Sequence, residues 1–301
     1  MSMLTPSYIR AEASDLLCKL SFPEDAAKVL TDALEKLLAP SVYDDFSQLL
    51  LQYDENERCN YIEMIDKMKL ISEKAGIHEY TGAMLLFICM APRLKKRYAE
   101  LGIDEAIFYD SLSDLRYKLY ECIDVYGVVG TFVASWYAGF FRLDRFAFGR
   151  LQFDKKPLGF ECEYNGVKLS ADSIGLNTHI PRTGGRLDHD EVLKSYRRAR
   201  EFFGEYFEIK PAIFFCSSWL LDPWNLTVLT EKSNLYAFIK DFKIVETGEY
   251  ADYKEAWRLF DMMYTGDVDA LPQNSSLRRA YAERIRRGEK LGWGRGVFIM
   301  E

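Results

Sequence analysis

The stretch IGLNTHIPRTGGRLDHDEVLKSYRRAREFF, residues 174–203, decides how the second half of the chain folds. Residues 174–180 have the length and composition of a β-strand. Residues 188–207 predict a helix, because their apolar side chains recur at helical spacing. Two glycines lie between the strand and the helix. A strand, a glycine-containing loop and a helix in this order predict a layered structure of mixed α and β elements.

Further strand signals surround this stretch. Residues 145–153 alternate in part between apolar and polar side chains, and residues 212–216 and 297–300 are short apolar runs. The dipeptide Asn165-Gly166 separates two short strand-like runs within residues 160–169. Asn-Gly is the strongest short signal of a β-hairpin, because both of its residues tolerate positive φ. The second half of the chain is therefore expected to contain a sheet.

The first half predicts helices. Thr5 and Pro6 suit the N-cap and first turn of a helix, and Gly76 suits a C-terminal stop. The expected helices are a first one with apolar positions from Ile9 to Leu20, a second between Pro23 and Pro40, and others over 42–53, 56–74, from Glu79 to Pro92, and 104–125. We therefore expect an α+β protein with a helical N-terminal domain over residues 1–125 and a mixed domain over 126–301.

The composition excludes several classes of protein. The 301 residues are 49% hydrophobic, 28% charged and 15% aromatic, which excludes a disordered chain. A net charge of −7 and a pI near 5.3 argue against a nucleic-acid partner. The longest apolar stretch, residues 127–141, is shorter than the ~20 residues that a membrane helix needs. The N-terminus shows no signal-peptide pattern, so a cytoplasmic protein that does not bind membranes is expected.

Cysteine and histidine usage argues against a metal site. There are six cysteines, none in a C-x-x-C pair, and three histidines, His78, His179 and His189. No spacing among them fits zinc ligands. The cysteines are expected to be reduced and buried, and no metal is expected.

The loop after the 174–180 strand is the first candidate site. It contains Arg182, Thr183, Gly184, Gly185 and Arg186. Glycine N–H groups next to a helix N-terminus favour anions, and arginine forks suit phosphate. The loop therefore fits a cradle for the pyrophosphate of a cofactor such as coenzyme A. The alternative is an ordinary turn, in which Asp188 and Glu191 form a capping box whose carboxylates repel phosphate.

His179 and Ser217 are the catalytic candidates. Alternation places His179 on the same strand face as Asn177 and opposite Leu176. A neutral imidazole there could act as a general acid or base, or could simply be held by a backbone hydrogen bond. Ser217 ends the next predicted strand, where a hydroxyl could be exposed and reactive or could simply bond to the backbone. Its neighbour Cys216 is expected to be a small core residue rather than a nucleophile.

An arginine-rich tract lies near the C-terminus. Arg284 and several neighbours lie within residues 278–295, with few carboxylates to balance them. The tract could attract phosphate or an acidic partner, or could be a solvated helix face. Trp219 and Trp224 are expected to serve packing.

Several segments, in order, resemble a bacterial acyltransferase family that joins a helical N-terminal N-acyltransferase domain to a GNAT-like C-terminal domain. They are GRLQFD (149–154), HIPRTGG (179–185), CSSWLLDP (216–223), SNLYAF (233–238), SSLRRAYAERIRRG (275–288) and LGWGRGVF (291–298). The resemblance implies acetyl-CoA or another acyl-CoA as donor, with its pyrophosphate on the loop after a central strand. Arg182 and Gly185 match the R-x-x-G-x-G/A pattern of related loops, whereas Leu187 departs from it. Relatives often carry a histidine at the position of Ser217.

Two hypotheses remain. The first is an acyl-CoA-dependent acyltransferase acting on the amine or hydroxyl of a small molecule or protein, with His179 as base. The second is a non-catalytic GNAT-like module that binds a ligand or a protein, which the departure at Leu187 favours. The helical half would cover the acceptor site or mediate a homodimer.

Overall fold

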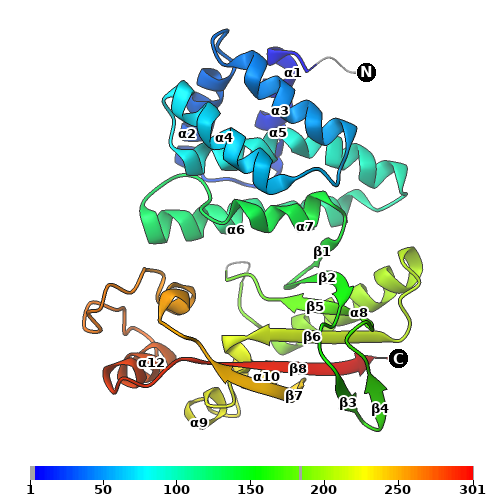
Figure 1. The fold of residues 1–301 in the computed structure, drawn as a ribbon, viewed down its shortest axis with the longest axis vertical. Coiled ribbons are helices and arrows are strands. Elements are labelled where there is room, and N and C mark those ends of the chain that lie inside the picture. The colour runs from blue at the N-terminus through cyan, green and yellow to red at the C-terminus, as the bar shows by residue number, and fades with distance from the viewer. Residues whose placement is uncertain (1–3, 183–184, 301) are drawn as a thin grey trace. The chain divides into compact units, whose positions relative to one another are not determined.

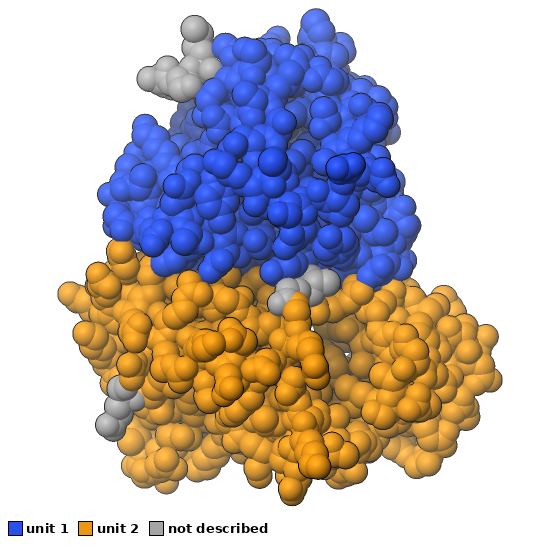
Figure 2. All heavy atoms as spheres, turned by 180° about the vertical axis from the view of Figure 1, so that it is seen from behind, with its two compact units in different colours: residues 1–146 blue, residues 147–301 orange. Residues whose placement is uncertain are grey.

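The computed structural model describes residues 4–182 and 185–300 of the chain. It contains two compact units, residues 1–146 and residues 147–301 (Figure 2). The first unit is helical, and the second is a mixed sheet with helices (Figure 1). The α+β class expected from the sequence is thereby confirmed. The boundary between the compact units lies within strand β1 (Arg145–Phe148).

The helical unit is organised around one long apolar helix, α5, which packs against helices α1, α2, α3, α4 and α6 and against η1. Its residues from Thr81 to Ala91 are all buried, because they are apolar or small on every side. The helices of the unit are α1 (Pro6–Lys19), α2 (Glu24–Leu37), α3 (Tyr43–Glu55), α4 (Tyr61–Ala75), α5 (Glu79–Glu100), α6 (Glu105–Tyr126), η1 (Ala134–Tyr137) and α7 (Ala138–Phe141).

Helix α5 corrects one expectation. The sequence predicts that this helix ends at Pro92, but it continues to Glu100. A proline inside a helix removes one backbone hydrogen bond and costs ~3 kcal/mol. The residues after it compensate, since Leu94 and Tyr98 are almost completely buried. Packing of the helix therefore outweighs the local signal.

The second unit is built on a six-stranded sheet in the order β1-β2-β5-β6-β8-β7. The pairs β2–β5, β6–β8 and β7–β8 are antiparallel, and β5–β6 is parallel. The sequence did not reveal β7, whose side chains are largely exposed, and it showed only the end of β8. The strands are β1 (Arg145–Phe148), β2 (Leu151–Pro157), β5 (Ile174–His179), β6 (Ala212–Ser218), β7 (Lys243–Glu249) and β8 (Gly292–Met300).

Helix α8 (His189–Tyr206) connects the parallel strands β5 and β6 and packs on one face of the sheet. Its Tyr196 ring lies 5.0 Å from Phe214 and 4.8 Å from Phe298, measured between ring centroids. Phe153 of β2 completes this aromatic core. Because alternate side chains of a strand point to opposite faces, the residues next to Phe153 and Phe214 lie on the other face.

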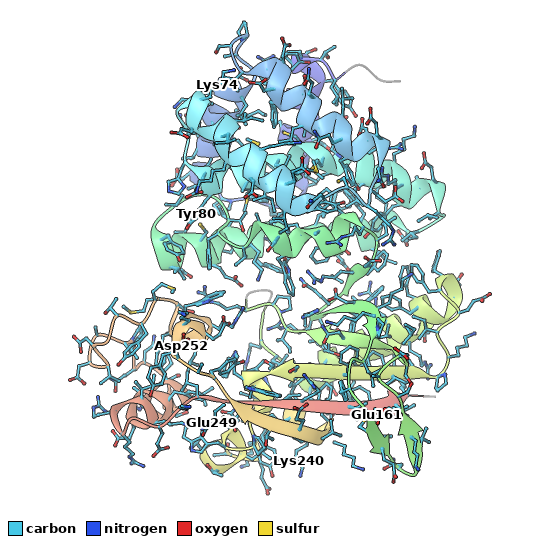
Figure 3. The ribbon with its side chains drawn as sticks, in the orientation of Figure 1. Lys74, Tyr80, Glu161, Lys240, Glu249 and Asp252 are labelled. Atoms are coloured by element: carbon cyan, nitrogen blue, oxygen red, sulfur yellow. The ribbon has the colours of Figure 1, made fainter. Side chains whose placement is uncertain are left out.

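A small hairpin of β3 (Cys162–Tyr164) and β4 (Val167–Leu169) packs against that other face. Asn165 and Gly166 join its strands, and both have positive φ, which confirms the hairpin expected from this dipeptide. Leu169 contributes to a core with Phe215 of the sheet. Figure 3 labels Glu161, which precedes the hairpin.

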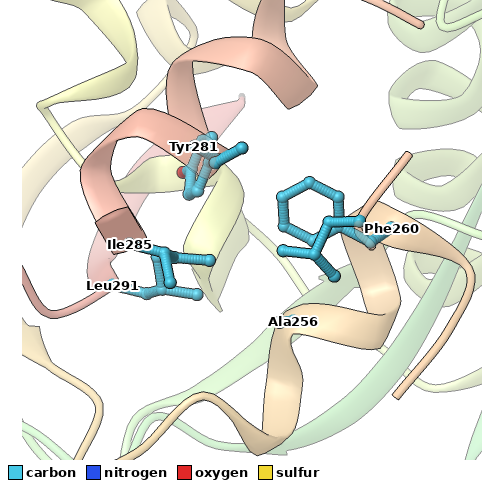
Figure 4. Packing of buried hydrophobic residues seen from close by; sticks show 7 residues of the cluster. Ala256, Phe260, Tyr281, Ile285 and Leu291 are labelled. Carbon is cyan, nitrogen blue, oxygen red and sulfur yellow. The ribbon is translucent and has the colours of Figure 1, made fainter. Parts of the chain in front are cut away.

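A long segment, residues 250–291, connects β7 to β8 and is called the excursion below. It contains η3 (Lys254–Ala256), α11 (Trp257–Phe260) and α12 (Ser276–Arg286). These short elements have a core of their own, in which Phe260 and Tyr281 are fully buried (Figure 4). Three further short elements precede β7: η2 (Trp219–Leu221), α9 (Asn225–Val228) and α10 (Asn234–Lys240).

Candidate active site

The central strands β5 and β6 stop pairing before they end. Their ladder joins Leu176 to Phe214 and Asn177 to Phe215, whereas β5 continues to His179 and β6 to Ser218. On its other edge, β6 stays paired with β8 as far as Ser218. The carboxyl ends of the two parallel strands therefore part from each other, which is where open α/β sheets usually bind ligands.

His179 lies at this point and is held by two polar side chains. Its Nε2 atom is 2.7 Å from Oδ2 of Asp154 and 3.0 Å from the side-chain amide of Asn177. Asp154 lies on β2 directly opposite Asn177, so all three side chains share one face of the sheet. The expected grouping of His179 with Asn177, opposite Leu176, is thereby confirmed. The sequence did not reveal Asp154, although a carboxylate after Leu151 and Phe153 interrupts an apolar strand and is a usable signal.

Ser217 continues this polar face on the neighbouring strand. Its side chain is exposed and forms no hydrogen bond with the described residues. Ser217 lies opposite Arg295 of β8, whose guanidinium is 2.5 Å from Glu246 of β7. Next to it, Cys216 is 2% exposed and points to the opposite face. Burial raises the pKa of the Cys216 thiol to about 12, so the reactive thiolate is suppressed.

The loop after β5 is only partly described, because Thr183 and Gly184 lie outside the described residues. Gly185 has a φ of +97°, a conformation that favours glycine. Arg186 is exposed and forms no ion pair with any described residue. Arg182 is engaged: its Nε is 2.9 Å from Oδ1 of Asp261 in the excursion.

The same carboxylate also accepts a hydrogen bond from Arg278, which in turn donates to the carbonyl oxygen of Leu259. Asp261 therefore joins the loop after β5 to the excursion through two arginines. A phosphate at Arg182 would have to share that side chain with Asp261.

The N-terminus of α8 is capped from within. Asp188 accepts a hydrogen bond from the backbone N–H of Asp190 at 3.1 Å. Glu191 pairs with Lys194 and not with the backbone of Asp188. The capping alternative is thus correct for Asp188, while the reciprocal half of the capping box does not form. The Asp188 carboxylate and the acidic first turn leave this helix end less favourable for phosphate.

A buried polar network fixes the turn that follows Ser218. Asp222 and Arg284 form an ion pair of 2.7 Å, and their side chains are only 9% and 10% exposed. The Arg284 guanidinium also lies 4.5 Å from the Trp224 ring centroid. Asn225 donates to the Trp219 carbonyl at 2.9 Å. The interpretation of the arginine tract as a solvated face thus fits the exposed end of α12 but not Arg284.

The two tryptophans of this turn serve packing, as expected. Their rings lie 5.7 Å (Trp219) and 4.9 Å (Trp224) from the ring of Tyr281. The Tyr281 hydroxyl donates to Asn225 at 2.7 Å. Neither a group of residues that could hold a metal nor a helix able to span a membrane occurs among residues 4–182 and 185–300.

Comparisons with known proteins agree with this geometry. Residues 11–143 match the N-acyltransferase N-terminal domain, and residues 146–298 match the GNAT-like C-terminal domain. No curated protein matches the sequence.

Solved acyltransferase structures share the fold. An acyltransferase in complex with decanoyl-CoA and teicoplanin is 25% identical, with a TM-score of 0.74 over 97% of this chain and 88% of that one. An acyltransferase with CoA and 10C-teicoplanin is 23% identical, with a TM-score of 0.75 over 96% and 88%. A mutant acyltransferase with octanoyl-CoA is 23% identical, with a TM-score of 0.74 over 97% and 88%. The chain belongs to the family that joins an N-acyltransferase N-terminal domain to a GNAT-like C-terminal domain.

Proposed function

We propose that the protein is an acyltransferase that moves an acyl group from acyl-CoA to an amine or hydroxyl. The observation that carries this proposal is the parting of β5 and β6, with His179 and Ser217 at the two strand ends. Membership of the family supports it, as do the similar acyltransferases that were crystallised with CoA, octanoyl-CoA or decanoyl-CoA.

The strand ends suit the extended arm of coenzyme A. This arm carries two amide groups, which can pair with strand backbone as an added strand does. Beyond Asn177 and Phe215, the two strands no longer pair with each other. Such a ligand would pair along these facing edges. An arm bound there would bring its thioester to the level of His179 and Ser217.

His179 is the proposed general base. It would accept the proton of the attacking amine or hydroxyl as the new bond forms to the acyl carbon. The carbon–sulfur bond of the thioester then breaks, and the same proton passes to the departing CoA thiolate. A positioned base of this kind contributes about 10²–10⁴-fold to the rate. Ser217, with its exposed hydroxyl, is the second proposed catalytic residue and would donate a hydrogen bond to the thioester oxygen or the leaving sulfur.

We assign the donor's phosphates to the loop of Arg182, Thr183, Gly184, Gly185 and Arg186. Arg186 is the stronger candidate, because it is exposed and its charge is not neutralised by an ion pair with a described residue. Arg182 would share its guanidinium between phosphate and Asp261. Removing the charge of Arg186 should therefore weaken CoA binding more than removing that of Arg182.

The first experiment is calorimetric titration of CoA, acetyl-CoA, octanoyl-CoA and decanoyl-CoA into the purified protein. Micromolar binding that weakens tenfold or more in Arg186→Ala would support the donor assignment, because a charge-assisted phosphate contact is worth ~1.5–3 kcal/mol. Absence of binding up to millimolar concentrations would refute it and would favour the non-catalytic binding module.

Turnover is then measured as CoA release with a panel of amines and hydroxyl compounds, detected by chromatography. His179→Gln should lower kcat by 10²–10⁴-fold. His189→Gln is the matched control, since His189 also pairs with a carboxylate but lies at the start of α8. An equal loss in both variants would contradict a specific role for His179.

The acceptor is the least constrained part of the proposal. Teicoplanin, a glycopeptide, is bound in a similar acyltransferase, so glycopeptide amines belong in the acceptor panel beside small amines. The cytoplasmic location and the homodimer expected from the sequence stay predictions, the second of which light scattering would test.

A further inference from the structure

Asp154 and His179 form a pair that decides which ring nitrogen can act as a base. The Oδ2 atom of Asp154 is 2.7 Å from Nε2 of His179, and Asp154 is 8% exposed. An ionised carboxylate has no hydrogen to donate, so the hydrogen in this bond belongs to Nε2. A neutral imidazole carries one N–H, and its lone pair then lies on Nδ1.

The amide of Asn177 is compatible with this assignment once its two ends are exchanged. Its nitrogen Nδ2 lies 3.0 Å from the same Nε2 atom, and two donors cannot share one hydrogen bond. The oxygen and nitrogen of an amide can exchange places without a change of shape, so Asn177 can present its oxygen to the ring N–H. With Asn177 turned in this way, both side chains accept from Nε2–H, and the carboxylate of Asp154 makes the shorter contact. They also fix the plane of the ring from β2 and from β5, since Asp154 and Asn177 lie directly opposite each other in the sheet.

We propose that Asp154 is a positioning residue, which holds His179 as its Nε2–H tautomer and so makes Nδ1 the atom that accepts the acceptor's proton. This inference rests on the proposed role of His179 as base. When the ring gains its second proton, the Asp154 carboxylate also stabilises the imidazolium. Asp154 itself touches neither substrate nor donor in this scheme.

The chain provides an internal control pair. His189 at the start of α8 has its Nε2 atom 2.9 Å from Oδ1 of Asp241, in the same kind of bond. Burial raises the pKa of Asp241, and the bond from His189 partly offsets this rise. This pair has the same chemistry as Asp154 and His179 but no place in the proposed reaction.

The experiment combines nitrogen-15 NMR of the histidine rings with steady-state kinetics. With only three histidines in the chain, His179→Gln and His189→Gln assign the ring signals directly. In the wild type at a pH where the rings are neutral, His179 should be in the Nε2–H form. Asp154→Leu removes the acceptor and should shift His179 towards a mixture of tautomers.

The value of kcat should depend on the tautomer of His179. We expect Asp154→Leu to lower kcat by about 10–100-fold, less than the 10²–10⁴-fold expected for loss of the base itself, with little change in KM for acyl-CoA. Asp154→Asn keeps an acceptor oxygen and should retain the tautomer and most of the activity, which also covers the case in which the leucine variant does not fold. Asp241→Leu should change the His189 tautomer and leave kcat unchanged.

Two results would overturn the inference. One is an Nδ1–H form of His179 in the wild type, and the other is an unchanged tautomer in Asp154→Leu. A third result would refute His179 as base while leaving the pairing intact. In that case Asp154→Leu changes the His179 tautomer, but kcat is unchanged both in Asp154→Leu and in His179→Gln.

Discussion

The ion pair between Asp222 and Arg284 should dominate the stability of the turn after β6. Its atoms are 2.7 Å apart and both side chains are about nine-tenths buried. The substitution Asp222→Asn removes the negative charge but keeps an oxygen for the Trp224 N–H, which Asp222 Oδ1 accepts at 3.1 Å. The loss therefore reports on the ion pair and not on the local turn.

The expected cost is large because the Arg284 side chain is only 10% exposed and would keep an unpaired charge. Breaking a buried pair by removing one partner costs ~3–5 kcal/mol, and the nearest remaining carboxylate, that of Glu289, is 4.0 Å away. We take ~3 kcal/mol, since the asparagine oxygen still accepts a hydrogen bond. For a unit of this size, ~1 kcal/mol corresponds to ~2–4 °C, so Tm should fall by about 6–12 °C.

Thermal and urea unfolding followed by tryptophan fluorescence is the assay, because Trp219, Trp224, Trp257 and Trp293 all lie in the second unit. Glu283→Gln is the matched control. It removes a carboxylate from α12, the helix that carries Arg284. Glu283 and its partner Arg287 are 45% and 63% exposed, so Tm should be nearly unchanged. If Asp222→Asn lowers Tm no more than Glu283→Gln, the reasoning about burial is wrong.

Three further predictions follow from single side chains. Cys216 should resist iodoacetamide at pH 8 while the exposed Cys18 reacts, as peptide mass spectrometry would show. Burial raises the pKa of Cys216 from 9.0 to about 12, so the stability gained by burying the neutral thiol is complete below pH ~9 and is lost as the pH rises to 12. Tyr196→Phe should leave Tm unchanged or raise it, because the buried hydroxyl has no hydrogen-bond partner among the described residues, whereas Tyr281→Phe should lower the unfolding free energy by ~1–2 kcal/mol by removing its bond to Asn225. Asp188→Ser keeps a capping oxygen but removes a negative charge, so calorimetry should find CoA binding two- to fivefold tighter if the phosphates lie at this end of the loop.

The sequence predicted what depends on local signals. The hairpin at Asn165-Gly166 was predictable because positive φ is required at both positions, and helix α8 was predictable because Tyr196 and its apolar neighbours recur every three or four residues. Strand β7 was missed because an edge strand with exposed side chains has no apolar pattern. Pro92 misled because the burial of helix α5 is a property of the packed unit.

The site was predictable only in part, for a related reason. His179 and Ser217 could be placed on strand ends from alternation. Their partners come from distant parts of the chain: Asp154 is 25 residues before His179, and Arg295 lies on the last strand. Sheet register brings such residues together, and register is not visible in one sequence. The tie between Arg182 and Asp261 is of the same kind.

The charges around the glycine loop limit how a donor could bind. Asp188 accepts a hydrogen bond from an N–H group at the start of α8, and Asp261 forms an ion pair with Arg182. The helix end and one arginine therefore already have partners within the protein. The loop then offers phosphate mainly its own backbone N–H groups and Arg186. An exposed arginine is screened by salt and contributes modestly. If the donor binds as proposed, most of the affinity for acyl-CoA should come from the ends of β5 and β6, where backbone groups and His179 would contact the thioester arm. Binding energy concentrated beside the reacting atoms favours turnover over tight retention of free CoA, which suits a donor that must leave after each transfer.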